Sequence, residues 1–356
     1  MKIKHVGLIL LCLLALFAVV SCKSTPSADA DQVNQEQVST DALGVAVDRA
    51  LAAQKLISDF EGPVSFPVEW KAANDLLGDA ETNKSIATIQ EIQESTERYV
   101  KAAEAFEGMS ADVLGRYYEV KEAEIIAVRN AVVAAGAEEL IPELLADADN
   151  AIASAEEKYE VKDYYGAKDS AGDALAMYET LKVGLDAYAV REKIAERNFE
   201  GYDPQNIALA DDTLRSAADD YTAKNMVSAK DKAEAALLRY NLAIKTAWES
   251  YAAGKGSEAA SSRQAALDVR ANVAVRQEFN TAQDVFNRAN SSLRDQKYDE
   301  AAIGFEDSIR RFDAVVVTTG EKRVVAEEAL ELANQRMAES DEMARNAEVI
   351  LEGGEE

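Results

Sequence analysis

The residue with the clearest chemical role in this sequence is Cys22, which follows Ser21. A basic start and an unbroken apolar run over residues 6–20 precede it, and together they are typical of a cleaved export signal. A cysteine that becomes the first residue after the cut can be lipidated, because its thiolate takes a diacylglyceryl group and its freed amine can take a third acyl chain. We therefore predict a signal peptide over residues 1–21 and a lipid anchor on Cys22.

Two other interpretations of this segment are a transmembrane anchor and a cleaved signal with an incidental cysteine. The apolar run is short for a helix that must cross ~30 Å of hydrocarbon. Residues 22–40 are polar and rich in Ser, Asp and Gln, which predicts a flexible tether. Two or three acyl chains anchor a protein stably, because each buried CH₂ contributes about 0.8 kcal/mol. Lipid-mediated membrane attachment in a bacterial cell envelope is the expectation.

The remaining composition excludes most catalytic and metal chemistry. The one histidine, His5, and Cys12 both lie within the signal, so the mature chain has no imidazole and no free thiol. This excludes Ser-His-Asp and Cys-His catalysis, zinc sites built from His or Cys, and structural disulfides. We expect no metal and no cofactor.

The charge of the chain excludes nucleic acid as a partner. The formal net charge is −27, and such a surface repels phosphate backbones. The carboxylates are scattered beside Lys and Arg along helical segments, where water and counter-charges keep them ionised. We therefore expect no catalytic carboxylate pair, and no enzyme activity.

After residue 40 the sequence predicts helix throughout. Ala, Leu, Glu, Lys and Asp dominate, proline occurs only five times in the whole chain, and no stretch alternates with the period of a strand. A chain of 356 residues also exceeds what one core usually serves, so several packing units are expected.

An internal repeat defines these units, because adding 62 to the numbers of a set of residues returns the same residue types. The set is Pro142, Ala148, Ala155, Tyr159, Lys162, Ala167, Lys168, Asp169, Ala171, Ala174 and Tyr178. A diverged copy spans residues 282–312, and the earliest copy starts at Pro67. The seven-residue spacing of Ala148 and Ala155 places them on one helix stripe. Each copy is predicted to be an antiparallel hairpin of helices A and B, with Ala171 and Ala233 buried where B meets A.

A third helix, C, is predicted after each hairpin. Its copies are residues 111–133, 185–198, 258–273 and 321–347, with a forerunner over 41–60. Breaks between B and C are expected at 108–110, 254–256 and 318–320, where glycine occurs. Gly184 is a weaker break, which leaves one long helix open as an alternative for the second copy.

The hairpins resemble tetratricopeptide repeats, and the last copy fits best. Its matching residues are Ala289, Leu293, Tyr298, Ala301, Phe305 and Ser308. The period of 62 to 75 departs from the ~34 residues of that family, and the proline that should close helix B is missing. The resemblance implies an all-α solenoid of tetratricopeptide-like hairpins, to which the predicted C helix adds an extra helix per unit.

This solenoid is expected over residues 41–347. Its units are about 41–134, 135–198, 199–273 and 274–347, and an acidic tail follows over 348–356. The residues before Cys22 resemble the relaxed lipoboxes of spirochaete lipoproteins, and treponemal lipoproteins are the nearest overall likeness. Alanine-rich helical domains of envelope lipoproteins show a similar pattern.

Two classes of function remain open on these grounds. The favoured one is a non-catalytic, lipid-anchored scaffold or adaptor that faces the periplasm and docks another envelope protein. The candidates for its partner-binding patch are Tyr118, Tyr165 and Tyr202. The alternative is implied by resemblance to treponemal tetratricopeptide lipoproteins, which serve periplasmic solute transporters and hold ligands in an apolar channel. An enzyme that uses carboxylates alone finds no support in the sequence.

Overall fold

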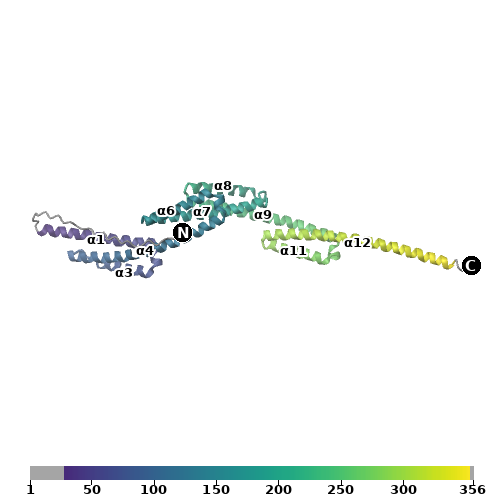
Figure 1. The fold of residues 1–356 in the computed structure, drawn as a ribbon, viewed down its shortest axis with the longest axis horizontal. Coiled ribbons are helices and arrows are strands. Elements are labelled where there is room, and N and C mark those ends of the chain that lie inside the picture. Colours follow the sequence, from purple (N-terminus) through teal and green to yellow (C-terminus); the bar gives the residue numbers. More distant parts are fainter. Residues whose placement is uncertain (1–27, 353–356) are drawn as a thin grey trace. The chain divides into compact units, whose positions relative to one another are not determined.

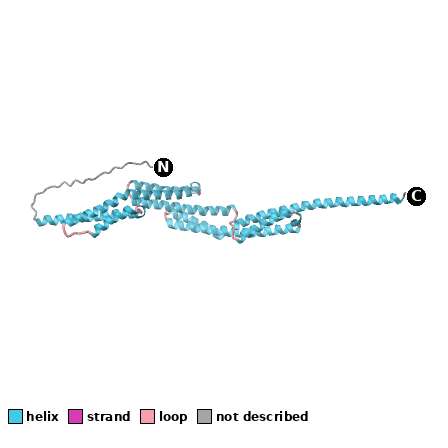
Figure 2. Cartoon of the chain, turned by 90° about the horizontal axis from the view of Figure 1, so that it is seen from below, coloured by secondary structure: helices cyan, strands magenta, loops and turns pink. Residues whose placement is uncertain are grey.

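The computed structural model describes residues 28–352, and the chain divides into two compact units, 1–123 and 124–356. The described residues form helices and turns, without a strand (Figure 2), so the predicted all-α class is confirmed. Cys22, the signal peptide and the first part of the expected tether lie outside the described residues.

The first unit packs three helical segments around one another. It contains α1 (Ala28–Asp59), the one-turn helix α2 (Gly62–Ser65), α3 (Pro67–Thr82) and the first part of α4 (Ile89–Ala134). The Gln54 amide of α1 donates to the Asn74 side chain of α3 at 2.7 Å. Arg49 of α1 donates two hydrogen bonds to Glu107 of α4. Both α3 and α4 are therefore held against α1.

The second unit contains three hairpins in series. Its elements are the end of α4, α5 (Ala137–Leu140), α6 (Pro142–Glu160), α7 (Tyr164–Glu196), α8 (Pro204–Thr222), α9 (Met226–Asp268), α10 (Ala271–Ala274), α11 (Arg276–Arg294) and α12 (Tyr298–Glu352). In Figure 1, α8 lies along the first half of α9, and α11 along the first half of α12. These pairs, with α6 and α7, are the predicted A and B helices.

The helix boundaries follow from local chemistry. Proline at the first position begins α3, α6 and α8, where its missing N–H has no intrahelical partner to lose. The Asp163 carboxylate caps α7 by accepting from the Gly166 N–H at 3.0 Å. A residue with positive φ follows the end of four long helices: Glu61, Gly136, Asn198 and Arg270. This left-handed residue turns the chain into the next hairpin.

The structure corrects the prediction of a separate C helix in three copies, because α4, α9 and α12 run without interruption through 108–110, 254–256 and 318–320. In the second copy the alternative of one long helix is confirmed, since α7 runs through Gly184. One glycine inside a helix costs only about 1 kcal/mol, which tertiary packing readily offsets. Gly256 has a packing role, since a Cβ there would lie 3.2 Å from the Phe305 ring.

The helices α7 and α9 are therefore shared between neighbouring hairpins: the first half of each pairs with the preceding A helix, and its second half packs against the hairpin that follows. The second half of α4 packs against α6 and α7, whereas residues 321–347 of α12 are exposed. The apolar clusters consequently change from one hairpin to the next inside α7 and α9. The helix α1 begins at Ala28, so residues 28–40 are helical instead of the flexible tether that was predicted. At the other end α12 extends to Glu352, into the expected tail.

Candidate binding site

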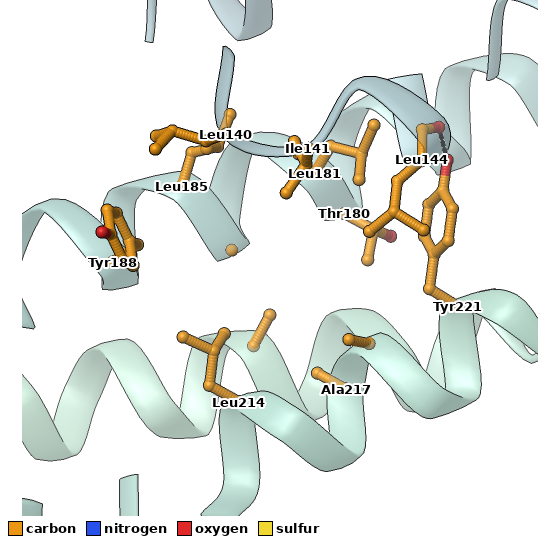
Figure 3. A pocket seen from close by; sticks show the side chains of 13 residues that line it. Leu140, Ile141, Leu144, Thr180, Leu181, Leu185, Tyr188, Leu214, Ala217 and Tyr221 are labelled. Atoms are coloured by element: carbon orange, nitrogen blue, oxygen red, sulfur yellow. Dashed lines mark hydrogen bonds between the residues drawn. The ribbon is translucent and has the colours of Figure 1, made fainter. Parts of the chain in front are cut away.

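The second unit contains an apolar pocket of about 250 Å³ (Figure 3). Its residues come from the α5–α6 corner, α7, α8 and one position of α9. They are Leu140, Ile141, Leu144, Thr180, Leu181, Gly184, Leu185, Tyr188, Leu214, Ala217, Ala218, Tyr221 and Ala233. None of these side chains is an acid, an amine or a guanidinium, so the pocket presents apolar surface with a few hydroxyl groups.

Two helix faces with the same residue spacing form the walls. On α7, Leu181 begins a series at i, i+3, i+4 and i+7 that ends at Tyr188, and on α8 the same spacing runs from Leu214 to Tyr221. This spacing keeps each series on one face of its helix. The space arises because a small residue, such as Gly184, occupies the middle of each series. A Cβ added at Gly184 would meet no other atom within 4 Å.

A buried tyrosine fixes the end of the pocket. The Tyr221 hydroxyl donates to the Leu144 carbonyl oxygen at 2.9 Å, which ties α8 to α6 (Figure 3). Beside it, the Lys224 ammonium lies 3.1 Å from the Asp147 carboxylate. Both contacts join consecutive hairpins, so the pocket walls are held by hydrogen bonds as well as by apolar packing.

A polar cluster joins α4, α6 and α7. The Tyr178 hydroxyl and the Arg129 guanidinium both donate to the Asp149 carboxylate, with Arg129 Nε 2.7 Å from it. The hydrogen bonds from Arg129 and from Tyr178 lower the pKa of Asp149.

The repeat reproduces this cluster 62 residues later. The Tyr240 hydroxyl donates to Asp211 at 2.5 Å, and Arg191 Nε donates to the same carboxylate at 3.2 Å. In the last hairpin Phe312 takes the tyrosine position, and the acceptor for Arg263 is the amide oxygen of Gln283. The arginine thus donates to a carboxylate in the two clusters where a tyrosine hydroxyl donates to the same group. It donates to an amide oxygen in the last hairpin, where the tyrosine is absent.

The buried tyrosines predict a loss of stability at alkaline pH. Burial raises the pKa of Tyr178, Tyr221 and Tyr240 above the ordinary value of about 10. A raised pKa in the folded state means that this stabilisation is complete below about pH 10 and is lost as the pH rises beyond it. Urea unfolding followed by circular dichroism should show a midpoint that falls above that pH. A variant with phenylalanine at all three positions should lose this pH dependence of the urea midpoint. A variant whose midpoint still falls with pH as in the wild type would contradict the role of these tyrosines.

Two of the three residues predicted as a partner-binding patch, Tyr165 and Tyr202, do not come together. Tyr118 lies in the first unit, half-buried, with its ring 6.1 Å from that of Phe60. Tyr165 and Tyr202 are exposed by 44% and 41%, but they lie near opposite ends of α7, which at 1.5 Å per residue is about 50 Å long. The apolar pocket was not among the predicted sites, although the matching spacing on α7 and α8 is visible in the sequence.

The predicted burial of the two equivalent alanines is confirmed, since Ala171 and Ala233 are both buried. Their surroundings differ, because Ala233 borders the pocket and Ala171 lies in the core of the preceding hairpin. We expect Ala171→Leu to lower the free energy of unfolding by about 1–3 kcal/mol through overpacking. Ala233→Leu should cost less, because its added atoms can enter the pocket. Thermal unfolding of both variants checks this, and equal losses would contradict it.

Comparison with known proteins identifies no relative of this chain. Searches against protein-family profiles, curated proteins and solved structures find no match to this chain. Among the described residues, no helix combines the length and apolar character needed to span a membrane. The same residues contain no cluster of three or more His, Cys, Asp or Glu side chains suited to a metal ion.

Proposed function

We infer that the chain is a lipid-anchored scaffold of a bacterial cell envelope, attached through Cys22, which docks another envelope protein on its repeat surface. The observation that carries this inference is the apolar pocket between consecutive hairpins. In this proposal the tetratricopeptide-like hairpins act as a solenoid that presents grooves for a peptide or a helix of the partner.

The dimensions of the pocket favour a protein partner. Small-molecule sites usually occupy about 300–1,000 Å³, and this pocket has about 250 Å³. Such a space suits one or two apolar side chains that project from a partner helix or strand. The exposed side chains of Leu140 and Tyr188 extend the apolar surface beyond the pocket, which gives the partner backbone a place to lie.

The lining also supports a non-catalytic role. General acid–base and nucleophilic catalysis need an ionisable or activated group that touches the substrate. The pocket offers only the hydroxyls of Thr180, Tyr188 and Tyr221, and the last of these donates to Leu144. The carboxylates of Asp149 and Asp211 are engaged in inter-helix hydrogen bonds.

A second candidate function is an accessory carrier for a periplasmic solute transporter. The same apolar lining favours it, because a small apolar molecule would bury its surface against Leu181, Leu185 and Leu214. This candidate predicts a small molecule, rather than a polypeptide, in the occupied pocket.

Filling the pocket from within tests the proposal. Gly184→Phe places a ring in the pocket. Gly172→Phe on the same helix is the matched control, because a Cβ there also meets open space but Gly172 does not line this pocket. After detergent extraction and purification, the scaffold role predicts a stoichiometric second polypeptide with the wild type and the control, lost with Gly184→Phe. A small apolar molecule that is lost in the same way would favour the carrier. If no sample contained either a second polypeptide or a small apolar molecule, the result would contradict both the scaffold and the carrier function.

A further inference from the structure

The tripeptide Asn-x-Ser, in which x is not proline, is the acceptor sequence for attachment of a glycan to asparagine in exported proteins. It occurs twice in this chain, at Asn83 with Ser85 and at Asn290 with Ser292. The tripeptide alone is a frequent pattern, so the structure around each asparagine decides which of the two a glycan-transferring enzyme can reach.

The backbone conformation decides whether the asparagine and the serine can be contacted together. The transferase must hold the side-chain amide that reacts and the hydroxyl two residues later. In a helix, residues two apart point to nearly opposite sides, because each residue turns the chain by about 100°. In an extended segment, residues two apart lie on the same face. An acceptor tripeptide is therefore expected outside a helix, at the surface.

Asn290 does not meet this condition. It lies with Ser291 and Ser292 inside α11, and its side-chain amide donates to the Phe286 carbonyl oxygen at 3.0 Å. The residue is also half-buried. Asn290 therefore serves as an internal comparison for the other asparagine, rather than as a second candidate.

Asn83 meets the condition, because α3 ends at the residue before it. Residues 84–86 are neither helix nor turn, and no other run of three residues within 28–352 has this character. Asn83 and Lys84 are exposed. Glu81, two residues before Asn83, is exposed as well and offers the transferase a carboxylate, whereas Arg288 stands at the same place before Asn290. The chain thus presents one of its two tripeptides in a form that a transferase can bind.

Hydrogen bonds fix this segment at Ser85 and leave Asn83 at the surface. The hydroxyl of buried Ser95 on α4 accepts from the Ser85 N–H at 2.9 Å and donates to the Ser85 carbonyl oxygen at 3.0 Å. The Ser85 hydroxyl donates to the Glu91 carboxylate at 3.0 Å. The Asn83 amide donates to Asp79, one helical turn earlier, at 3.0 Å to its carbonyl oxygen and 2.7 Å to its carboxylate. Water can replace these exposed hydrogen bonds at little net cost, so the amide can turn toward a transferase without opening the core.

We propose that Asn83 is the acceptor of an N-linked oligosaccharide, which a transferase attaches after export from a lipid-linked oligosaccharide diphosphate. The Asn83 amide nitrogen forms a bond to the anomeric carbon of the sugar, and the bond from this carbon to the phosphate oxygen breaks. The lipid diphosphate leaves with the electron pair, and one amide proton passes to a base of the transferase. This modification goes beyond the scaffold function and rests only on the export that this function includes.

Mass spectrometry of the full chain, purified from its native cells, tests the modification. The peptide that contains Asn83 should carry the mass of an oligosaccharide, located on the Asn83 amide by fragmentation. Asn83→Gln and Ser85→Ala should both lose this mass completely, because one removes the reacting asparagine and the other the hydroxyl. Ser85→Thr keeps the hydroxyl and should retain the glycan, and Asn290→Gln is the matched control that should leave it unchanged. An unmodified Asn83, a sugar on Lys84 instead, or a glycan that survives Asn83→Gln or Ser85→Ala would overturn the proposal.

The lipid on Cys22 is measured on the same molecules and keeps this test separate from the scaffold function. A chain with the lipid and without a glycan on Asn83 would overturn the glycosylation alone. A chain with the glycan and without the lipid would support the glycosylation and overturn the lipid anchor. A chain with neither would overturn both.

Discussion

Replacing Gly254 by proline is expected to lower the free energy of unfolding by about 3 kcal/mol or more. Gly254 lies inside the continuous helix α9, far from either end. Proline removes the backbone N–H that bonds to the carbonyl four residues earlier, and its ring clashes with that carbonyl. Because the two halves of α9 serve different packing units, the break should also loosen the contact between them. Urea unfolding followed by circular dichroism measures the loss.

Alanine at the same position is the matched control. A Cβ at Gly254 meets no other atom within 4 Å, and glycine is disfavoured in a helix interior by about 1 kcal/mol relative to alanine. Gly254→Ala should therefore stabilise the protein slightly. If residues 254–256 formed a break between two helices, proline would be tolerated there, so an unchanged unfolding midpoint for Gly254→Pro would contradict the continuous helix.

Replacing Cys22 by serine is expected to release the protein from the membrane completely. A serine hydroxyl cannot form the thioether that carries the diacylglyceryl group, and without acyl chains the anchoring energy of about 0.8 kcal/mol per CH₂ is lost. No described helix can substitute for the lipid as a membrane span. Fractionation of cells at high salt should move the variant from the membrane to the soluble fraction.

Cys12→Ser provides the control for this prediction, because Cys12 lies in the apolar run that is predicted to be removed with the signal. That variant should remain with the membrane and keep the mass of the lipidated chain. A Cys22→Ser protein that still sediments with membranes at high salt would contradict the lipid anchor.

The hairpins were predictable because the same residue types recur at equivalent positions of the repeat. The match of Tyr178 to Tyr240 and of Ala171 to Ala233 fixes two helices and their facing stripes, and the structure confirms these elements. The continuity of the long helices was not predictable from local propensity. Gly256 favours a break, yet its role is to let α12 approach α9 at Phe305, which only the tertiary contact reveals.

The pocket and the polar clusters depend on pairs of helices that are distant in sequence. The Arg129–Asp149 and Arg191–Asp211 pairs become visible only once the spacing of 20 residues is compared across copies. The exposed tyrosines looked like a binding surface because aromatic residues are enriched at interfaces. Tyr165 and Tyr202 lie near opposite ends of one helix, so no single contact can join them.

The measurement that tests the scaffold role most directly is site-specific photo-crosslinking at Leu140 in intact cells. Leu140 is exposed and borders the pocket, so a reactive side chain there reports what occupies it. The account predicts a single conjugate with one other envelope polypeptide, which Gly184→Phe abolishes and Gly172→Phe preserves. A conjugate that persists with Gly184→Phe, an adduct with small molecules alone, or no conjugate at all would contradict it.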